Sequence, residues 1–345
     1  MKKLFILLFS FLTISAYAEA AAEGGEFKPG DLITHHIADD YSWHFADGVT
    51  LYLPVILVDN GQVQVFSSGN FYNENHELVP HNGYVLNHGH IYRADASGEP
   101  AADQSGLLDF SITKNVASLF LSVILLFAVF LTIAGSYKKN QGKAPRGLQS
   151  FFEPLVIFVR DEIAKGNIGP KYERFMPYLL TIFFFIWFNN LLGLMPGGAN
   201  LTGNIAVTMV LALMTLLITL FSANKTYWSH IFATPGVPKW LAPIMIPVEL
   251  IGILTKPFSL MVRLFANITA GHIIILSLFS LIFIFQSIAV GPLSVLFATF
   301  MFFLELLVAL LQAYIFTLLS AMYFGGAVEE HDHVDDMGFG DGAQH

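Results

Sequence analysis

The sequence predicts an all-α polytopic membrane protein with five membrane segments, the last two forming a long tilted helical hairpin, and a small extracytoplasmic β module near the N-terminus. Of the 345 residues, 54% are hydrophobic and only 12% are charged, about half the charged share of a soluble domain. Five apolar segments are long enough to cross a bilayer. The polar stretch before them carries strand and turn signals instead.

The N-terminus has the pattern of a secretory signal, which we assign to residues 1–18. Lys2 and Lys3 precede an apolar core, and the small residues Ala16 and Ala18 flank Tyr17 as at a cleavage site. The alternative is an uncleaved anchor, although the apolar run is short for a span. In both cases the following segment is exported.

We expect residues 19–110 to form an extracytoplasmic β module. The runs Thr50–Val58 and Gln62–Phe66 flank Asn60-Gly61, a strong hairpin signal, and Tyr84–Tyr92 resembles a further strand. Acidic residues outnumber basic ones here, which excludes a basic nucleic-acid surface. The histidines repeat no metal-ligand spacing, so we expect no metal and no cofactor.

Residues 111–325 form the expected membrane domain. A basic run from Lys138 to Arg146 follows the first span and places that end in the cytoplasm. The segment 147–169 alternates apolar with charged residues and is amphipathic rather than spanning. The five expected spans are Val116–Ile133, Phe175–Leu194, Ile205–Phe221, Ile244–Phe285 and Leu293–Phe324.

The last two spans are unusually long. As single helices, Ile244–Phe285 would be about 63 Å long and Leu293–Phe324 about 48 Å, against a hydrocarbon thickness of about 30 Å. We therefore expect an antiparallel hairpin that is strongly tilted, or kinked at Pro257. The alternative, that one segment is two spans, would leave no polar loop between the pieces. Residues 326–345 form an acidic, histidine-rich tail expected in the cytoplasm.

The first of these long segments carries ionisable residues where lipid-facing sequence carries none. Glu249, Lys256 and Arg263 are each seven residues apart and project from one helix face, and Asn267 stays on that face. An ionisable group at membrane depth is costly and marks an ion path or a buried pair. One alternative is thus that Arg263 only neutralises an acid, Glu249 or Glu305.

The second long segment contributes Glu305 and Gln312, again seven residues apart. If Gln312 is level with Arg263 in the hairpin, Glu305 lies about 10 Å and His272 about 13 Å further toward the outer turn. The two residues then share one depth, where an imidazole and a carboxylate can pass protons near neutral pH. Arg263 does not deprotonate, so it acts as a fixed charge that separates two half-paths.

Two motifs resemble a known family. The run RLFANITAGH (263–272), preceded by Lys256-Pro257, and the run LQAYIFTLLSAMY (311–323) are similar to subunit a of the F-type ATP synthase membrane sector. The resemblance covers residues 110–324 and does not extend to the N-terminal module. It implies that Arg263 faces a rotor ring of c subunits, with Gln312 as polar partner and Asn267 on the rotor-facing surface.

The resemblance also assigns the remaining site residues. In some relatives an acid stands at the position of His272 and a histidine at the position of Glu305. Glu249 matches an acid of the cytoplasmic path, whereas Asn190 and Asn204 are similar to residues lining the outer path.

The implied protein is a non-catalytic stator proton channel, embedded in the bilayer of the bacterial plasma (inner) membrane. Its implied partners are the c-ring and the b subunits of the peripheral stalk, and we expect no nucleic acid among them. The rival interpretations are an intramembrane enzyme and a self-contained ion transporter. Against the enzyme, the sequence lacks H-E-x-x-H and G-x-S-x-G and has no cysteine. Against the transporter, it lacks paired half-repeats with broken helices.

Overall fold

The computed structural model describes residues 30, 38–46, 49–73, 77–95, 97–139, 142, 144–195, 197–232, 239–285 and 290–329. The expected signal peptide at residues 1–18 lies outside this part of the chain. So does the tail from residue 330 onward.

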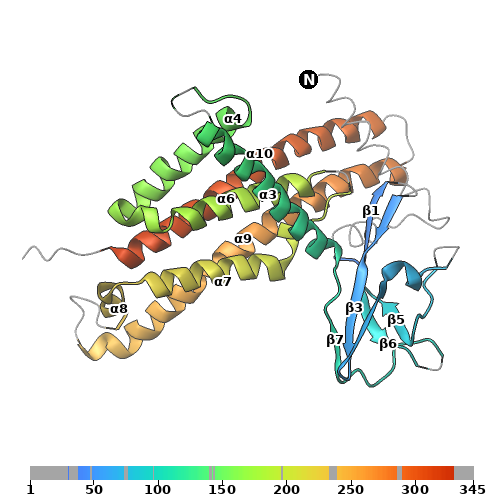
Figure 1. Cartoon of the computed structure of the whole chain (residues 1–345). Coiled ribbons are helices and arrows are strands. Elements are labelled where there is room, and N and C mark those ends of the chain that lie inside the picture. Colours follow the sequence, from blue (N-terminus) through green and yellow to red (C-terminus); the bar gives the residue numbers. More distant parts are fainter. Residues whose placement is uncertain are drawn as a thin grey trace, which may run out of the picture.

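Five helices in the described part are long and apolar enough to cross a membrane, which confirms the predicted fold class. Each begins and ends within a few residues of an expected span. Figure 1 shows them packed as one helical body with a small strand-rich module at one end. The helices are α3 Lys114–Lys139, α6 Met176–Gly193, α7 Ile205–Ser222, α9 Ala242–Phe285 and α10 Val290–Val328.

The long hairpin is formed by α9 and α10, which pack against each other more extensively than any other pair of helices. Each is a single helix, so neither segment is divided into two spans. With 44 residues, α9 is about 66 Å long and exceeds the hydrocarbon thickness about twofold. The helix continues through the buried Pro257, so one unbroken helix takes up the excess length by tilt or bending.

The helical core lies between α6 and the second half of α10. Phe175, immediately before α6, stacks on Phe324 of α10, and buried small residues of α10, such as Ala313 and Ala321, belong to the same core cluster. Small residues let membrane helices approach closely, which replaces the hydrophobic driving force available in water. Helix α7 packs on α9 and also contacts α10.

The amphipathic segment packs on the bundle rather than crossing it. It comprises α4 Leu148–Phe158, a π-helical turn at Val159–Lys165 and the short α5 Gly166–Ile168. Its apolar side chains Val159 and Ile163 are fully buried. Hydrogen bonds from Arg160 and then Lys165 hold the pKa of Asp161 well below its usual range.

Short helical turns complete the membrane domain: a 3₁₀ turn at Gly169–Arg174, another at Leu201–Gly203, helix α8 at Lys225–Phe232 and a 3₁₀ turn at Lys239–Leu241. The turn at 201–203 belongs to the connection between α6 and α7. Helix α8 follows α7, in the stretch between two of the expected spans.

The N-terminal module is built from antiparallel strands. The predicted turn at Asn60-Gly61 is confirmed: both residues have positive φ, and the strands β3 and β4 pair across it. The strands are β1 Ser42–Ala46, β2 Val49–Tyr52, β3 Pro54–Asp59, β4 Gln62–Ser67, β5 Tyr84–Asn87, β6 His90–Arg93 and β7 Leu107–Asp109, with a 3₁₀ turn at Ser68–Phe71.

Two strand predictions were wrong in detail. The expected strand Thr50–Val58 is divided at Leu53, whose backbone bonds to Tyr41 and Ser68 instead of to a ladder partner. The expected strand Tyr84–Tyr92 is a hairpin, because His88 and Gly89 adopt positive φ and reverse the chain between β5 and β6.

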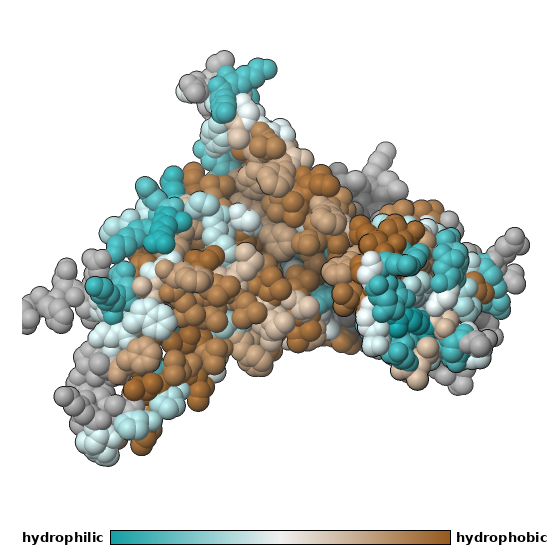
Figure 2. All heavy atoms as spheres, turned by 60° about the horizontal axis from the view of Figure 1, so that its bottom comes forward, coloured by the Kyte–Doolittle hydropathy of each residue, from teal (hydrophilic) through white to brown (hydrophobic). Residues whose placement is uncertain are grey.

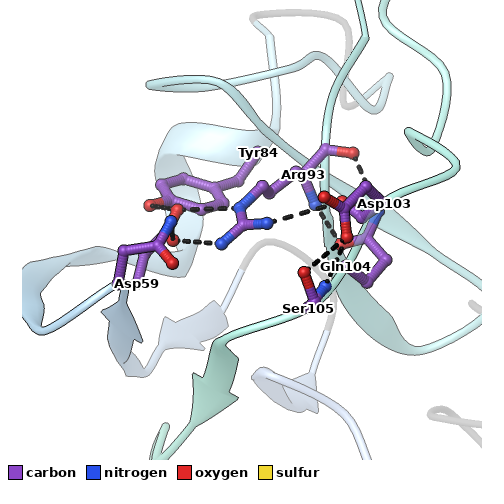
Figure 3. Close-up of polar contacts among 7 residues, drawn as sticks. Asp59, Tyr84, Arg93, Asp103, Gln104 and Ser105 are labelled. Atoms are coloured by element: carbon purple, nitrogen blue, oxygen red, sulfur yellow. Dashed lines mark hydrogen bonds and ion pairs between the residues drawn. The ribbon is translucent and has the colours of Figure 1, made fainter.

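A charged pair fastens the hairpin β5–β6 to the sheet β4-β3-β7. Nε of Arg93 donates to Asp59 at 3.0 Å, and the hydroxyl of Tyr84 donates to the same carboxylate at 3.0 Å. The hydrogen bond from Arg93 lowers the pKa of Asp59. Figure 3 shows this pair, the bond from the Arg93 backbone N–H to Oε1 of Gln104 and the bond from the Arg93 guanidinium to the Asp103 carbonyl.

The module is attached to one end of the helical body. The indole Nε1 of Trp43 donates to the carbonyl of Gly197, in the α6–α7 connection, at 2.6 Å. The Asp39 carboxylate accepts from the Asn115 backbone N–H at 3.0 Å, capping the first turn of α3. The module therefore lies on the side of the α6–α7 connection (Figure 1).

Candidate functional site

The first feature of the site is a hydrogen bond across the long hairpin. Nδ2 of Asn267 in α9 donates to Oε1 of Gln312 in α10 at 2.8 Å. Gln312 is fully buried, and its Nε2 has no hydrogen-bond partner among the described residues, whereas Asn267 is exposed on the opposite side of the bond. The bond fixes the relative height of the two helices.

Arg263 lies one helical turn before Asn267, on the same side of α9. Its side chain is half-buried, and it forms no ion pair with any acid in the described part of the chain. The alternative in which Arg263 only neutralises Glu249 or Glu305 is therefore not observed. A positive charge held at membrane depth without an acidic partner requires a counter-charge from elsewhere.

Glu305 is buried between the two long helices. Neither of its carboxylate oxygens has a hydrogen-bond partner within the described residues. The carboxylate lies directly against Gly271, so closely that a methyl group on that glycine would overlap Oε1. With Glu305 in this position, a side chain at residue 271 would displace the carboxylate.

His272 is the next residue along α9, so Glu305 and His272 lie at one level of the bundle. The imidazole points toward α6: its Nε2 would be 3.8 Å from a methyl group placed on Gly193. The carbonyl of Ala199, in the α6–α7 connection, is 3.5 Å from the same position. The common depth of His272 and Glu305 therefore agrees with the estimate from helical rise.

Polar side chains of α6 and the α6–α7 connection extend this level. Asn190 is buried; its Nδ2 donates to the Ala309 carbonyl of α10 at 3.1 Å, and its Oδ1 accepts from Thr202 at 2.7 Å. Asn200 is buried too, with Nδ2 unpartnered within the described residues. Asn204 instead caps α7, accepting from the Ala206 backbone at 2.9 Å.

Sequence reasoning missed Asn200 and Thr202. Both belong to an irregular connection, where no helical period relates them to the spans. The only available signal was the presence of polar residues in a loop without charges.

The other predicted residues lie toward the beginning of α9, away from His272. Glu249 is half-buried, and burial together with the charge of Glu249 raises the pKa of Tyr227 in α8. Lys256 is exposed, with Nζ 5.5 Å from the centre of the Tyr323 ring. Lys256, Tyr227 and Tyr323 border one small pocket between α7, α8, α9 and α10.

The described residues contain no group of three or more histidines and acids that could hold a metal ion. The polar residues instead form a series along the hairpin. Glu249 and Lys256 lie at one end, Arg263 with Asn267 and Gln312 in the middle, and a histidine–acid level beyond them. This arrangement can take up, hold and hand on small cations such as protons.

Comparisons with known proteins agree with this description. Residues 116–325 match the family model described as ATP synthase A chain, and residues 32–115 match a model described as a domain of unknown function. The chain is 48% identical over 237 residues to ATP synthase subunit a of Chloroherpeton thalassium, covering 67% of this chain and 71% of the relative. It is 41% identical over 332 residues to ATP synthase subunit a 2 of Chlorobaculum tepidum, covering 93% and 80%.

The packing of Glu305 against Gly271 predicts that two glycine-to-alanine substitutions in α9 differ in their effect on stability. Gly271→Ala inserts a methyl group into the Glu305 side chain and should cost about 1–3 kcal/mol of stability. Gly252→Ala is the matched control, because nothing lies within 4 Å of the added atom; it should be neutral or stabilise by up to about 1 kcal/mol. Thermal unfolding in detergent measures both, and equal midpoints for the two variants would contradict the packing.

Proposed function

The chain belongs to the ATP synthase A chain family, whose members are non-catalytic, proton-translocating subunits of the membrane sector. From this premise we propose that the chain conducts protons through two half-channels separated by Arg263. The observation that carries the proposal is a fixed cation with no acidic partner among the described residues, next to a separate level that holds an acid and an imidazole. Membership of this family favours the subunit over the two rival interpretations, an intramembrane enzyme and a self-contained transporter.

In this proposal Arg263 acts on a carboxylate of a partner subunit. Its charge favours the ionised form of an approaching carboxylate and so releases the proton of that group. Because a guanidinium stays protonated, protons do not pass through Arg263 itself. The Asn267–Gln312 bond holds α9 in register with α10, so that the cation stays at a constant height.

The first half-channel passes His272 and Glu305. Its support is the common level of the two residues and three buried polar side chains next to it, Asn190 of α6 and Asn200 and Thr202 of the α6–α7 connection. The unpartnered oxygens of Glu305 leave its hydrogen-bonding capacity free for water or a passing proton.

The second half-channel leads from Arg263 toward Glu249. It is supported by the small pocket that Lys256 borders and by Glu249 beyond it, near α8. Lys256 has a lesser role as a positive side chain at the edge of this path.

The partner carboxylate belongs, in this proposal, to a ring of c subunits. The surface of α9 around Arg263 supports such a contact, because the small residues Ala266 and Ala270 and the amide of Asn267 are exposed there. Small side chains allow another helix to approach closely. The b subunits of a peripheral stalk are the further partners implied by the complex.

We also propose an orientation in a bacterial inner membrane. The basic residues Lys138 and Lys139 end α3, which places that end in the cytoplasm by the positive-inside rule. The module at residues 19–110 and the α6–α7 connection then lie outside, and the C-terminus lies in the cytoplasm after an odd number of spans.

The charge of Arg263 is the first quantity to test. Arg263→Ala should abolish ATP-driven proton pumping in inverted vesicles, because the partner carboxylate loses the charge that deprotonates it. Arg263→Lys should also fail largely, since a buried lysine can give up its proton. Lys225→Ala removes an exposed cation from α8 and serves as the control that keeps pumping. Normal pumping by assembled Arg263→Ala complexes would overturn the proposed role.

The pairing of His272 with Glu305 predicts a rescue. Each single exchange, His272→Glu or Glu305→His, leaves two like groups that compete for charge in one low-dielectric site, so proton uptake should slow. The double exchange restores one acid and one imidazole and should pump faster than either single variant. Vesicles with matched amounts of assembled complex allow the comparison. A double variant no faster than the slower single one would show that the two residues act separately.

The orientation can be tested by labelling, because the chain has no cysteine of its own. Single cysteines at Ser97 and Ala343 are treated with a membrane-impermeant thiol reagent in intact cells with a permeable outer envelope. We expect the reagent to reach Ser97→Cys at once and Ala343→Cys only after lysis. Reaction of Ala343→Cys in intact cells would reverse the proposed topology.

A further inference from the structure

The sheet β4-β3-β7 of the N-terminal module has two apolar faces, of which the module covers only one. Val55 and Leu57 of β3 point into the module core together with Phe71. Because side chains alternate along a strand, the residues between them point to the other face. The strand pairings bring six apolar residues together there. This outer sheet face consists of Ile56, Val58, Val63, Val65, Leu108 and Phe110.

The outer sheet face is open in the described chain. Val63 is 63% exposed, Val65 65%, Leu108 56% and Phe110 62%. Antiparallel sheets with one solvated face usually alternate apolar with polar residues. A contiguous exposed apolar patch marks a protein, ligand or membrane contact.

The chain around the outer sheet face ties it to the membrane. Strand β7 ends at Asp109 and the spanning helix α3 begins at Lys114. The four residues between them reach at most about 14 Å, and the first of them, Phe110, belongs to the face. Further along the chain, α3 itself exposes large apolar side chains, among them Phe120 and Ile124. In Figure 1, β7 lies on the helix side of the module and the hairpin β5–β6 on the far side.

Charge is segregated in the way that a membrane contact requires. The ion pair of Asp59 with Arg93 lies on the core side of the sheet, and Asp95 and Asp103 lie in loops next to β6 and β7. The outer sheet face itself carries no charged residue. Figure 2 shows hydrophobic side chains on the part of the module that adjoins the helices and hydrophilic ones over the rest of that view.

We propose that the outer sheet face rests on the lipid bilayer, in the leaflet on the side of the α6–α7 connection, with its apolar side chains at the boundary between headgroups and acyl chains. The contact is apolar and not electrostatic, because the face offers no cation to anionic lipids. Together with the Trp43–Gly197 hydrogen bond, it would hold the module in a fixed position beside the α6–α7 connection.

The test uses adjacent residues that point to opposite faces of β4. The full-length chain, which has no cysteine, is prepared as Val63→Cys and as Gln62→Cys, and each is labelled with an environment-sensitive NBD dye. Gln62 is exposed on the core side of the sheet and is the matched control. Both proteins are reconstituted into phosphatidylcholine vesicles that contain lipids with a nitroxide at the top of the acyl chain.

We expect blue-shifted emission and nitroxide quenching several-fold stronger at residue 63 than at residue 62. The difference should persist when the vesicles contain anionic lipid and at high salt. Equal, weak quenching with free access for a water-soluble quencher would show that the face is solvated, and would overturn the proposal. Weak lipid quenching with protection from the aqueous quencher would also overturn it, because a second protein surface would then cover the face. Circular dichroism and proteolysis confirm that both variants fold.

Discussion

The arrangement of the membrane domain depends on the register between α9 and α10. Two contacts near Arg263 contribute to it: the hydrogen bond from Asn267 to Gln312 and the packing of Glu305 against Gly271. A lost partner is costly for a buried amide, so a shift of one turn would leave Gln312 without the hydrogen bond from Asn267. The small Gly271 and the polar pair thus specify one height, and with it the height of Arg263, which neither contact involves directly.

Helix α6 is fixed relative to the α9–α10 hairpin by a bond to the backbone of α10. Asn190 of α6 binds the Ala309 carbonyl of α10, one helical turn from Glu305, and Thr202 holds the other end of that amide. The histidine–acid level is therefore closed by residues of three helices and one connection. Because the connection also accepts the indole proton of Trp43 at Gly197, the N-terminal module and the polar level share one short segment of chain. A displaced module would disturb backbone that lies only a few residues from Asn200.

Much of this could be predicted from the sequence, because hydropathy and helical rise are sufficient for long apolar helices. The five spans were located to within six residues, and the rise placed Glu305 and His272 at similar depth once Gln312 was assumed level with Arg263. The hydrogen bond to Gln312 comes instead from Asn267, one turn beyond Arg263. The irregular segments could not be predicted in this way. Asn200 and Thr202 lie where no period applies, and the cap formed by Asn204 depends on where α7 begins. The division at Leu53 follows from tertiary bonds to Tyr41 and Ser68, which leave no local signal.

In the N-terminal module, the apolar pattern of one strand indicates an apolar environment on a face that the rest of the module does not cover. The run Val55-Ile56-Leu57-Val58 is apolar at every position, which is typical of a strand buried on both faces. The module buries Val55 and Leu57, whereas Ile56 and Val58 are half-buried and their strand neighbours Val63, Val65 and Leu108 are exposed. Solvent would select polar residues at those positions, as it did in the loops that carry Asp95 and Asp103. Strand β3 pairs with β7, which ends a few residues before the spanning helix α3. In our proposal the bilayer is the second apolar phase next to this sheet, and it satisfies the pattern of β3 without any further protein layer.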